Sequence, residues 1–116
     1  MIIFRKIGPL KKHLSRLRQD GKTGFVPTMG ALHQGHLQLV NTSLKENAHT
    51  LCSIFVNPTQ FNDPQDFQKY PITIESDIAK LDRQGCDILF LPSVDEIYPA
   101  GLGQGKQFEL GRLEQI

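Results

Sequence analysis

The sequence lacks a surplus of charge of either sign. Its 116 residues include 13 Lys and Arg against 12 Asp and Glu, which gives a formal net charge of +1. This balance gives no global indication of a nucleic-acid partner, an anionic membrane surface or an acidic protein. We therefore expect no nucleic acid and no membrane as partners, and any binding of anions has to come from a local site.

Long hydrophobic runs and targeting segments are also missing. No apolar stretch approaches the roughly 20 residues that a membrane-spanning helix needs. The first six residues are too short for the hydrophobic region of a signal peptide and contain no cleavage pattern. We expect a cytoplasmic protein. The length suits one compact domain, residues 1–116, and is too short for two.

Cysteine is scarce. Cys52 and Cys86 each lie in an apolar run, and their spacing fits neither a metal site nor a redox motif. Two reduced cysteines near strands of a cytosolic protein are the expected interpretation, and a structural disulfide is the alternative.

The sequence does contain short apolar runs of strand length, which alternate with segments whose apolar residues recur at helical spacing. Strands are expected at 2–4, 24–27, 50–56 and 87–91, and helices at 8–20, 35–47 and 74–84. Pro27 is expected to end the second strand, and the run at 50–56 has the continuous apolar character of a strand buried on both faces. This order predicts an α/β fold of Rossmann type, with a parallel sheet and helices on both faces.

Ligands of such sheets bind at the carboxyl ends of the strands, which directs attention to the loops after Val26 and Val56. The first of these, 27–36, reads Pro-Thr-Met-Gly-Ala-Leu-His-Gln-Gly-His and leads from a strand into a helix. The free N–H groups and positive dipole end of that helix form a ready anion site. Gly30 and Gly35 permit tight turning and a close approach of phosphate to the backbone.

His33 and His36 give this loop its chemistry. Three residues apart, they share one face of a first helical turn, where imidazoles can donate hydrogen bonds to phosphate oxygens. The loop is neither a Walker A motif nor the Gly-x-Gly-x-x-Gly fingerprint. Two alternatives stay open. One is a zinc site, although the zincin glutamate and a third nearby ligand are missing, and the other is a pair of surface histidines without a role.

The second loop begins with Asn57 and suits a small hydroxy acid. Gln60 carries an acceptor and two donors, so it can bridge a hydroxyl and a carboxylate. Asn57 can hold the ligand or the backbone, although Asn-Pro is by itself a common turn signal. Phe61 and Met29 can wall an apolar pocket, and ordinary core packing is an equal alternative for both.

His-x-Gly-His between a strand and a helix resembles the motif of the nucleotidylyltransferase superfamily, which includes the class I aminoacyl-tRNA synthetases. With its flanks, the segment is similar to the form found in the pantothenate synthetase family. Further segments that resemble this family are 53–61 (Ser-Ile-Phe-Val-Asn-Pro-Thr-Gln-Phe), 66–71, Asp77 and 92–99. The resemblance thus extends over about residues 2 to 99.

The resemblance implies an ATP-dependent ligase that joins pantoate to β-alanine. The pantoate carboxylate attacks the α-phosphorus of ATP and pyrophosphate leaves; the amine of β-alanine then attacks pantoyl adenylate, giving pantothenate and AMP. Mg²⁺ accompanies the triphosphate. Because family members are generally homodimers, we expect the complete enzyme to be one.

The same resemblance, carried over residue by residue, implies roles within the two loops. His36 is the implied catalytic histidine, a proton donor, and His33 is its partner on the phosphate side. The residues implied for ATP binding are Met29, Gly30, Ala31, Leu32, His33, Gln34, Gly35 and His36. Those implied for pantoate, and later β-alanine, are Gln60, Asn57, Pro27, Thr28 and Phe61.

Chains of the family are well over twice this length, so the C-terminal part, with its lysine loop, is absent here. Between residues 24 and 60 the only basic side chain besides histidine is Lys45, late on its helix. Two imidazoles and a dipole do not balance a leaving pyrophosphate, so we expect this chain alone to be weak or inactive. The rival interpretations are another His-x-Gly-His nucleotidylyltransferase, which segment 57–61 disfavours, and a non-catalytic nucleotide-binding fragment.

Overall fold

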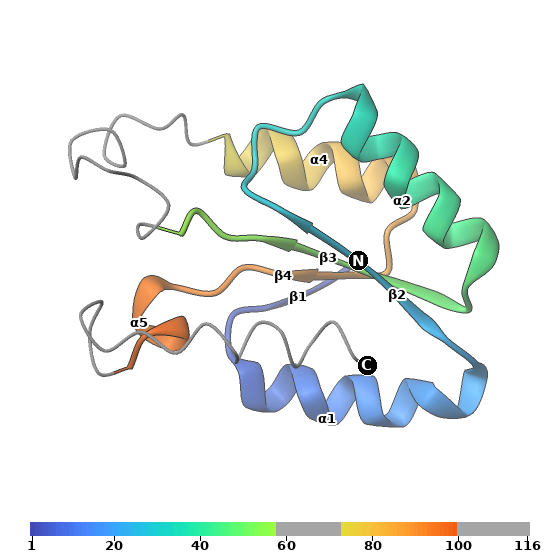
Figure 1. The fold of residues 1–116 in the computed structure, drawn as a ribbon, viewed down its shortest axis with the longest axis horizontal. Coiled ribbons are helices and arrows are strands. Elements are labelled where there is room, and N and C mark those ends of the chain that lie inside the picture. Colours follow the sequence, from blue (N-terminus) through green and yellow to red (C-terminus); the bar gives the residue numbers. More distant parts are fainter. Residues whose placement is uncertain (58–72, 100–116) are drawn as a thin grey trace.

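The computed structural model describes residues 1–57 and 73–99, in which a four-stranded sheet lies between two layers of helices (Figure 1). The strands are β1 (Ile2–Phe4), β2 (Thr23–Thr28), β3 (His49–Ile54) and β4 (Ile88–Phe90). The helices are α1 (Ile7–Leu17), the short 3-10 helix η1 (Arg18–Asp20), α2 (Gln34–Glu46), α4 (Ile74–Gln84) and α5 (Val94–Ile97). In this part of the chain no helix is long and apolar enough to cross a membrane.

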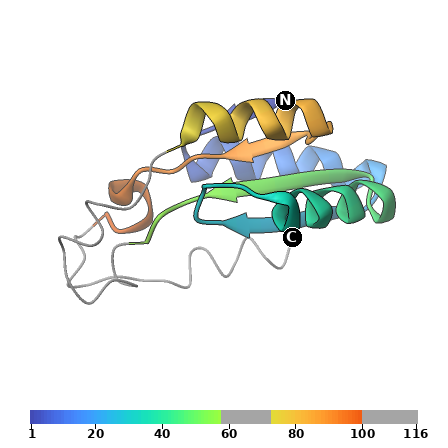
Figure 2. The same cartoon turned by 90° about the horizontal axis from the view of Figure 1, so that it is seen from above.

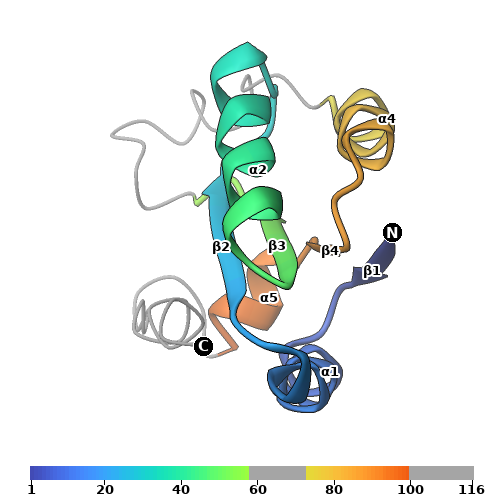
Figure 3. The same cartoon turned by 90° about the vertical axis from the view of Figure 1, so that its right-hand side faces the viewer.

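All neighbouring strands run parallel, in the order β1-β4-β3-β2, which confirms the predicted α/β class. Helix α1 carries the chain from β1 to β2 at the opposite edge, and α2 and α4 then lead back to β3 and β4. Helices α2 and α4 cover one face, while α1 and α5 lie on the other (Figures 1 and 3). The carboxyl ends of the strands therefore meet at one edge, where Figure 2 also places α5 and the loop that enters α2.

The core consists of two hydrophobic clusters, one on each face of the sheet. Side chains along β4 and just after it alternate between them: Ile88 and Phe90 join the cluster of α1, while Leu89 and the following Leu91 join the cluster of α2 and α4. Strand β3 is buried at every residue after His49, as expected for a strand covered on both faces. The sheet and its carboxyl edge are thus held from two sides.

Most boundaries of the elements lie close to the predicted ones, but β3 ends at Ile54 and not at residue 56, and α5 was not predicted. Helix α4 ends at Gly85, whose φ of 92° is left-handed, as a C-terminal glycine permits. The expectation that Pro27 ends the second strand is wrong, because β2 continues to Thr28 and Pro27 pairs with Ser53. The proline is tolerated because β2 is an edge strand of the described sheet, so one of its sides makes no ladder hydrogen bonds there.

Both cysteines are buried and free, in agreement with the reduced interpretation. Burial, together with the neighbouring Cys86, raises the pKa of Cys52 to about 12. Because the thiolate is the reactive form of cysteine, these side chains act as core residues.

Close packing of α2 against β2 depends on Gly24. A Cβ at this position would overlap Ser43 Oγ and lie 2.5 Å from Asn47 Nδ2. The Ser43 hydroxyl is hydrogen-bonded to Thr50 Oγ1 (2.6 Å), and Asn47 Nδ2 donates to Ser43 O (3.1 Å). A buried polar network therefore occupies the space that a side chain at residue 24 would need.

We predict that Gly24→Ala lowers the free energy of unfolding by about 2 kcal/mol, because the added methyl overpacks this network. The matched control is Gly8→Ala in α1, where no atom lies within 4 Å of an added Cβ. There the helix propensity of alanine should raise stability by up to about 1 kcal/mol. Urea unfolding followed by circular dichroism measures both variants, and equal midpoints would contradict the prediction.

Candidate functional site

The loop between β2 and α2 lies at the carboxyl edge of the sheet, as predicted. Asn57 follows β3 and Ser93 follows β4 at the same edge. Gln60 and Phe61, the other residues expected to contact pantoate, lie outside the described part of the chain. The structure thus brings the first predicted loop together with the beginning of the second.

The backbone of this loop makes a tight left-handed turn. Gly30 has a φ of 86° and Ala31 a φ of 50°, a region that favours glycine and is uncommon for alanine. The hydroxyl of Thr28 accepts from the N–H of Gly30 (3.2 Å) and donates to Ser53 O on β3 (2.9 Å). The start of the turn is therefore tied to the sheet.

The centre of the turn is held by Asp77 of α4. The N–H of Ala31 donates to its Oδ2 (3.0 Å) and the N–H of Leu32 to its Oδ1 (2.9 Å), while the hydroxyl of Thr73 donates to Oδ2 (3.0 Å). Asp77 is only 1% exposed. Successive N–H groups in such a turn form a concave anion site. Here the carboxylate of the protein itself fills it.

Lys80, one helical turn after Asp77, completes this contact by donating from Nζ to Leu32 O (2.9 Å). The side chain of Leu32 is buried in the cluster beneath α2 and α4. The sequence match included Asp77 without a role and missed Lys80. A signal was present, because Asp77 falls on the apolar face of α4 with Ile78 and Leu81, where an ionisable side chain indicates a buried partner.

His33 and His36 cap the N-terminus of α2 with their side chains. The N–H of His33 donates to His36 Nδ1 (3.1 Å), and the N–H of Gly35 donates to His33 Nδ1 (3.0 Å). The ring centroids are 4.1 Å apart. Because each Nδ1 accepts a hydrogen bond, each neutral ring carries its proton on Nε2.

Several N–H groups of the loop donate to acceptors within the protein. The N–H groups of Gly30, Ala31, Leu32, His33 and Gly35 all have partners inside the protein. Gly35 has a different use from the one expected, since a Cβ there would lie 2.8 Å from Cε1 of the His33 ring. The glycine therefore makes room for the imidazole of His33.

The surroundings of His36 favour its neutral form. Burial lowers its pKa below the ordinary value of 6.5, the neighbouring His33 lowers it further, and the carboxylate of Asp77 opposes them. A neutral ring keeps its Nδ1 lone pair available to cap the helix. The local electrostatics and the cap therefore support the same tautomer.

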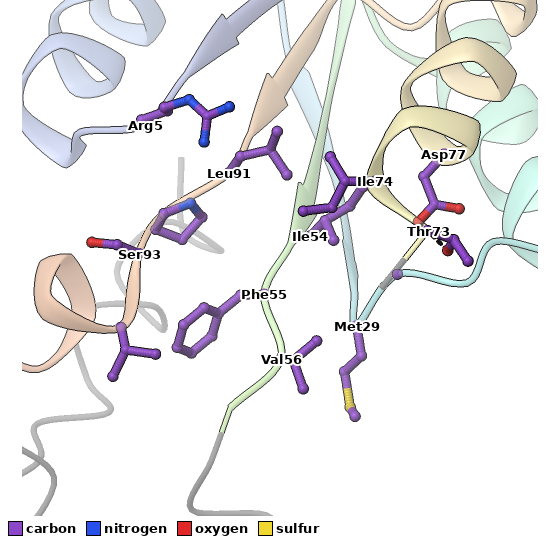
Figure 4. Close-up of a pocket in the computed structure, with 13 residues that line it drawn as sticks. Arg5, Met29, Ile54, Phe55, Val56, Thr73, Ile74, Asp77, Leu91 and Ser93 are labelled. Carbon is purple, nitrogen blue, oxygen red and sulfur yellow. Dashed lines mark hydrogen bonds between the residues drawn. The ribbon is translucent and has the colours of Figure 1, made fainter. Parts of the chain in front are cut away.

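A pocket of about 270 Å³ opens beside the loop (Figure 4). Its wall is mainly apolar and includes Met29, Ile54, Phe55, Val56 and Leu91. Arg5, just after β1, adds a cationic side chain that the sequence reasoning missed. From the loop between β2 and α2, Met29 and Gly30 line this pocket, whose volume lies just below those typical of ligand sites.

Contacts around α5 hold the other side of this edge. Tyr98, 2% exposed, donates from its hydroxyl to Asn57 Oδ1 (3.0 Å), so Asn57 is more than a turn residue. The side chain of Glu96 accepts from the N–H of Ile7 (2.8 Å), at the start of α1, and lies 3.7 Å from Lys6 Nζ. These contacts fix the chain segments next to the pocket.

The described residues do not gather a third ligand for a metal at the histidine pair. Within 1–57 and 73–99 there is no group of three or more His, Cys, Asp or Glu side chains able to hold an ion. A zinc site at His33 and His36 would need ligands from elsewhere.

A parallel α/β sheet with His-x-Gly-His between its second strand and the following helix defines a Rossmann-like protein of the nucleotidylyltransferase type. The model of the pantoate-beta-alanine ligase family matches residues 2–115. The chain belongs to this family.

Comparison with individual relatives supports the same family. The chain is 53% identical to the pantothenate synthetase of Flavobacterium psychrophilum over 98% of its own length and 41% of the relative's, and 48% identical to that of Cytophaga hutchinsonii over 100% and 41%. Among solved structures, the pantoate-beta-alanine ligase of Francisella tularensis, complexed with beta-gamma ATP and beta-alanine, has a TM-score of 0.82 at 48% identity, covering 87% of this chain and 39% of that one. The chain thus spans about two fifths of the length of these relatives.

We predict that the pKa of His36 lies below 6.5 and rises when His33 is replaced by Asn, since this removes one of the two lowering causes. Because the unfolded chain protonates first, stability falls as the pH drops from the unfolded pKa of 6.5 toward the folded one. Titration of the His36 Cε1–H signal by NMR measures the shift. An unchanged His36 pKa in the His33→Asn variant would contradict the electrostatic coupling.

Proposed function

We propose that this chain is the ATP- and pantoate-binding part of a pantoate–β-alanine ligase, which forms pantothenate through pantoyl adenylate. The observation that carries the proposal is the pair of histidine caps at the carboxyl edge. Both Nδ1 atoms accept hydrogen bonds within the loop, and neither Nε2 has a hydrogen-bond partner among residues 1–57 and 73–99. The pair therefore presents two Nε2–H donors for phosphate oxygens.

In this proposal the chemistry of His33 and His36 is hydrogen-bond donation to the α-phosphate. As the pantoate carboxylate attacks the α-phosphorus, negative charge grows on the phosphate oxygens, and the Nε2–H of His36 stabilises it. A depressed pKa suits this role, because the ring remains a neutral donor near pH 7. The pantoate carboxylate has to be activated because a carboxylate is a poor electrophile. In pantoyl adenylate, AMP is the leaving group when the amine of β-alanine attacks the carbonyl.

The pantoate site is proposed along the apolar wall that Met29 shares with the pocket. Two methyl groups of pantoate match such a wall, whereas its carboxylate and hydroxyls require polar partners, for which we propose Asn57 and Gln60. Support comes from the Tyr98 contact, which fixes the orientation of the Asn57 amide. For Pro27, Thr28 and Phe61, the resemblance of the two loops to the family is the support.

Mg²⁺ is proposed to arrive with the triphosphate. Asp77, the carboxylate that contacts the loop, already accepts three hydrogen bonds with its oxygens. We therefore assign its ligands to phosphate oxygens and water, and attribute no step to it here.

The proposal also covers the domain and its assembly. We propose that residues 1–116 form a nucleotide- and pantoate-binding domain and that the complete enzyme is a homodimer. The first point is supported by the two hydrophobic clusters that cover the described sheet on both faces, and the second by the family resemblance. A non-catalytic fragment that only binds nucleotide is the alternative for this chain.

We predict that His36→Ala weakens the binding of ATP–Mg²⁺ about tenfold, because one hydrogen bond to a charged phosphate is lost. Gln60→Ala should weaken pantoate binding by a similar factor. Isothermal titration calorimetry of this chain measures both.

The control is His13→Ala, a histidine on α1 across the sheet from the loop, and it should bind both ligands like the parent chain. If neither ligand binds to the parent chain, the chain does not form a working site by itself. Loss of ATP binding in the His13 variant would instead indicate an effect on folding.

We predict that the isolated chain produces pantothenate at least about a hundredfold more slowly than a full-length relative, because the two imidazoles of the loop do not by themselves balance the charge of a leaving pyrophosphate. Mass spectrometry of mixtures with ATP, pantoate and β-alanine measures the rate, with the Flavobacterium psychrophilum enzyme as reference. Turnover equal to the reference would refute this expectation, while ATP binding without turnover would favour the non-catalytic alternative.

A further inference from the structure

Helix α4 contributes two charged side chains that the proposed reaction does not use, and both contact Leu32. Asp77 accepts from its N–H (2.9 Å) and Lys80 donates to its carbonyl (2.9 Å). The second oxygen of Asp77 accepts from the N–H of Ala31 (3.0 Å). Opposite charges thus hold both sides of Leu32, the residue that follows the left-handed Gly30 and Ala31.

The turn needs this support. Ala31 has a positive φ of 50°, a conformation that costs free energy for a residue with a Cβ. Without a carboxylate at Asp77, the N–H of Leu32 would be a donor without its partner in a buried environment, which is a further cost. The conformation of the loop is therefore set from outside its own sequence, by a helix 46 positions further along the chain.

The loop passes this constraint directly to the histidine pair. Leu32 precedes His33, whose N–H donates to His36 Nδ1 (3.1 Å) and whose own Nδ1 accepts from Gly35 (3.0 Å). A displacement of Leu32 would move the His33 backbone and break the contact that fixes the His36 ring. The charge of Asp77 also reaches His36.

We propose that Asp77 and Lys80 are positioning residues, which hold the Leu32 peptide groups so that His33 and His36 present their Nε2–H donors together. This inference rests on the proposed function of the histidines. A direct role in the reaction is disfavoured for Asp77, because its oxygens already accept three hydrogen bonds and the residue is 1% exposed. Lys80 lies one helical turn after Asp77 and uses its ammonium to bind the Leu32 carbonyl.

The test compares Asp77→Asn with the control Glu75→Gln, an equal change of charge at an exposed residue of the same helix. An asparagine accepts with one oxygen only, so one of the N–H groups of Ala31 and Leu32 loses its partner. We expect hydrogen exchange of at least one of these amides to become about tenfold faster, and ATP affinity to fall about tenfold at a temperature where both variants are folded. The control should match the parent chain in both measurements.

Lys80→Met and Lys80→Arg keep the inference testable if the Asp77 variant does not fold. Methionine removes the donor to Leu32 O and should weaken ATP binding, while arginine retains a donor and should restore it. The imidazole ¹⁵N chemical shifts of His33 and His36 report their tautomers and can be measured without ATP. Both Nδ1 atoms are hydrogen-bond acceptors in the parent chain. We expect mixed tautomers in Asp77→Asn.

The outcomes separate the two proposals. Unchanged amide exchange and unchanged imidazole shifts in Asp77→Asn would overturn the positioning role. The positioning role would also be overturned if Asp77→Asn showed faster amide exchange but bound ATP like the parent chain, while His36→Ala bound ATP more weakly. If the parent chain does not bind ATP, the proposed function fails for this chain, and the amide and imidazole measurements still decide whether Asp77 and Lys80 position the histidines.

Discussion

The buried carboxylate of Asp77 is the contact on which the candidate site depends. A loop that turns through left-handed residues at the end of a strand exposes consecutive N–H groups, and burying such groups without acceptors is costly. Asp77 receives two of them, and Thr73 anchors the carboxylate from its own helix. The loop, the start of α2 and the histidine pair all follow from that arrangement, and α4 connects it to the core beneath.

This arrangement determines which atoms remain for a ligand. Five N–H groups of the loop donate within the protein, and in the proposed function phosphate is recognised by imidazole side chains whose tautomer is set by their caps. Neutral donors stabilise developing charge without carrying positive charge to the site. The nearby cations, Lys80 and Arg5, lie against Leu32 and along the pocket. In the proposed function, the described part of the chain would therefore orient phosphate groups better than it would neutralise a departing pyrophosphate.

Much of the fold was accessible from the sequence because its signals are local. Apolar period and terminal glycines are enough to place α4 and its end at Gly85, and the His-x-Gly-His segment is enough to indicate the functional edge. The continuation of β2 through Pro27 was not accessible, since it depends on the position of the strand at the edge of the described sheet. The partners of the loop N–H groups were equally hidden, because Asp77 lies more than 40 residues away in sequence.

The cap on α1 has a consequence for the order in which the chain folds. The first helical N–H, at Ile7, finds its acceptor in Glu96, 89 residues later, and β1 pairs with β4. Neither the first strand nor the start of the first helix has its stabilising partner until the last described elements have formed. These contacts of high sequence separation carry a large entropic cost of closure, and they join the beginning and end of the described chain into one cooperative unit. During synthesis the N-terminal strand has to wait for almost the whole of the described chain to emerge.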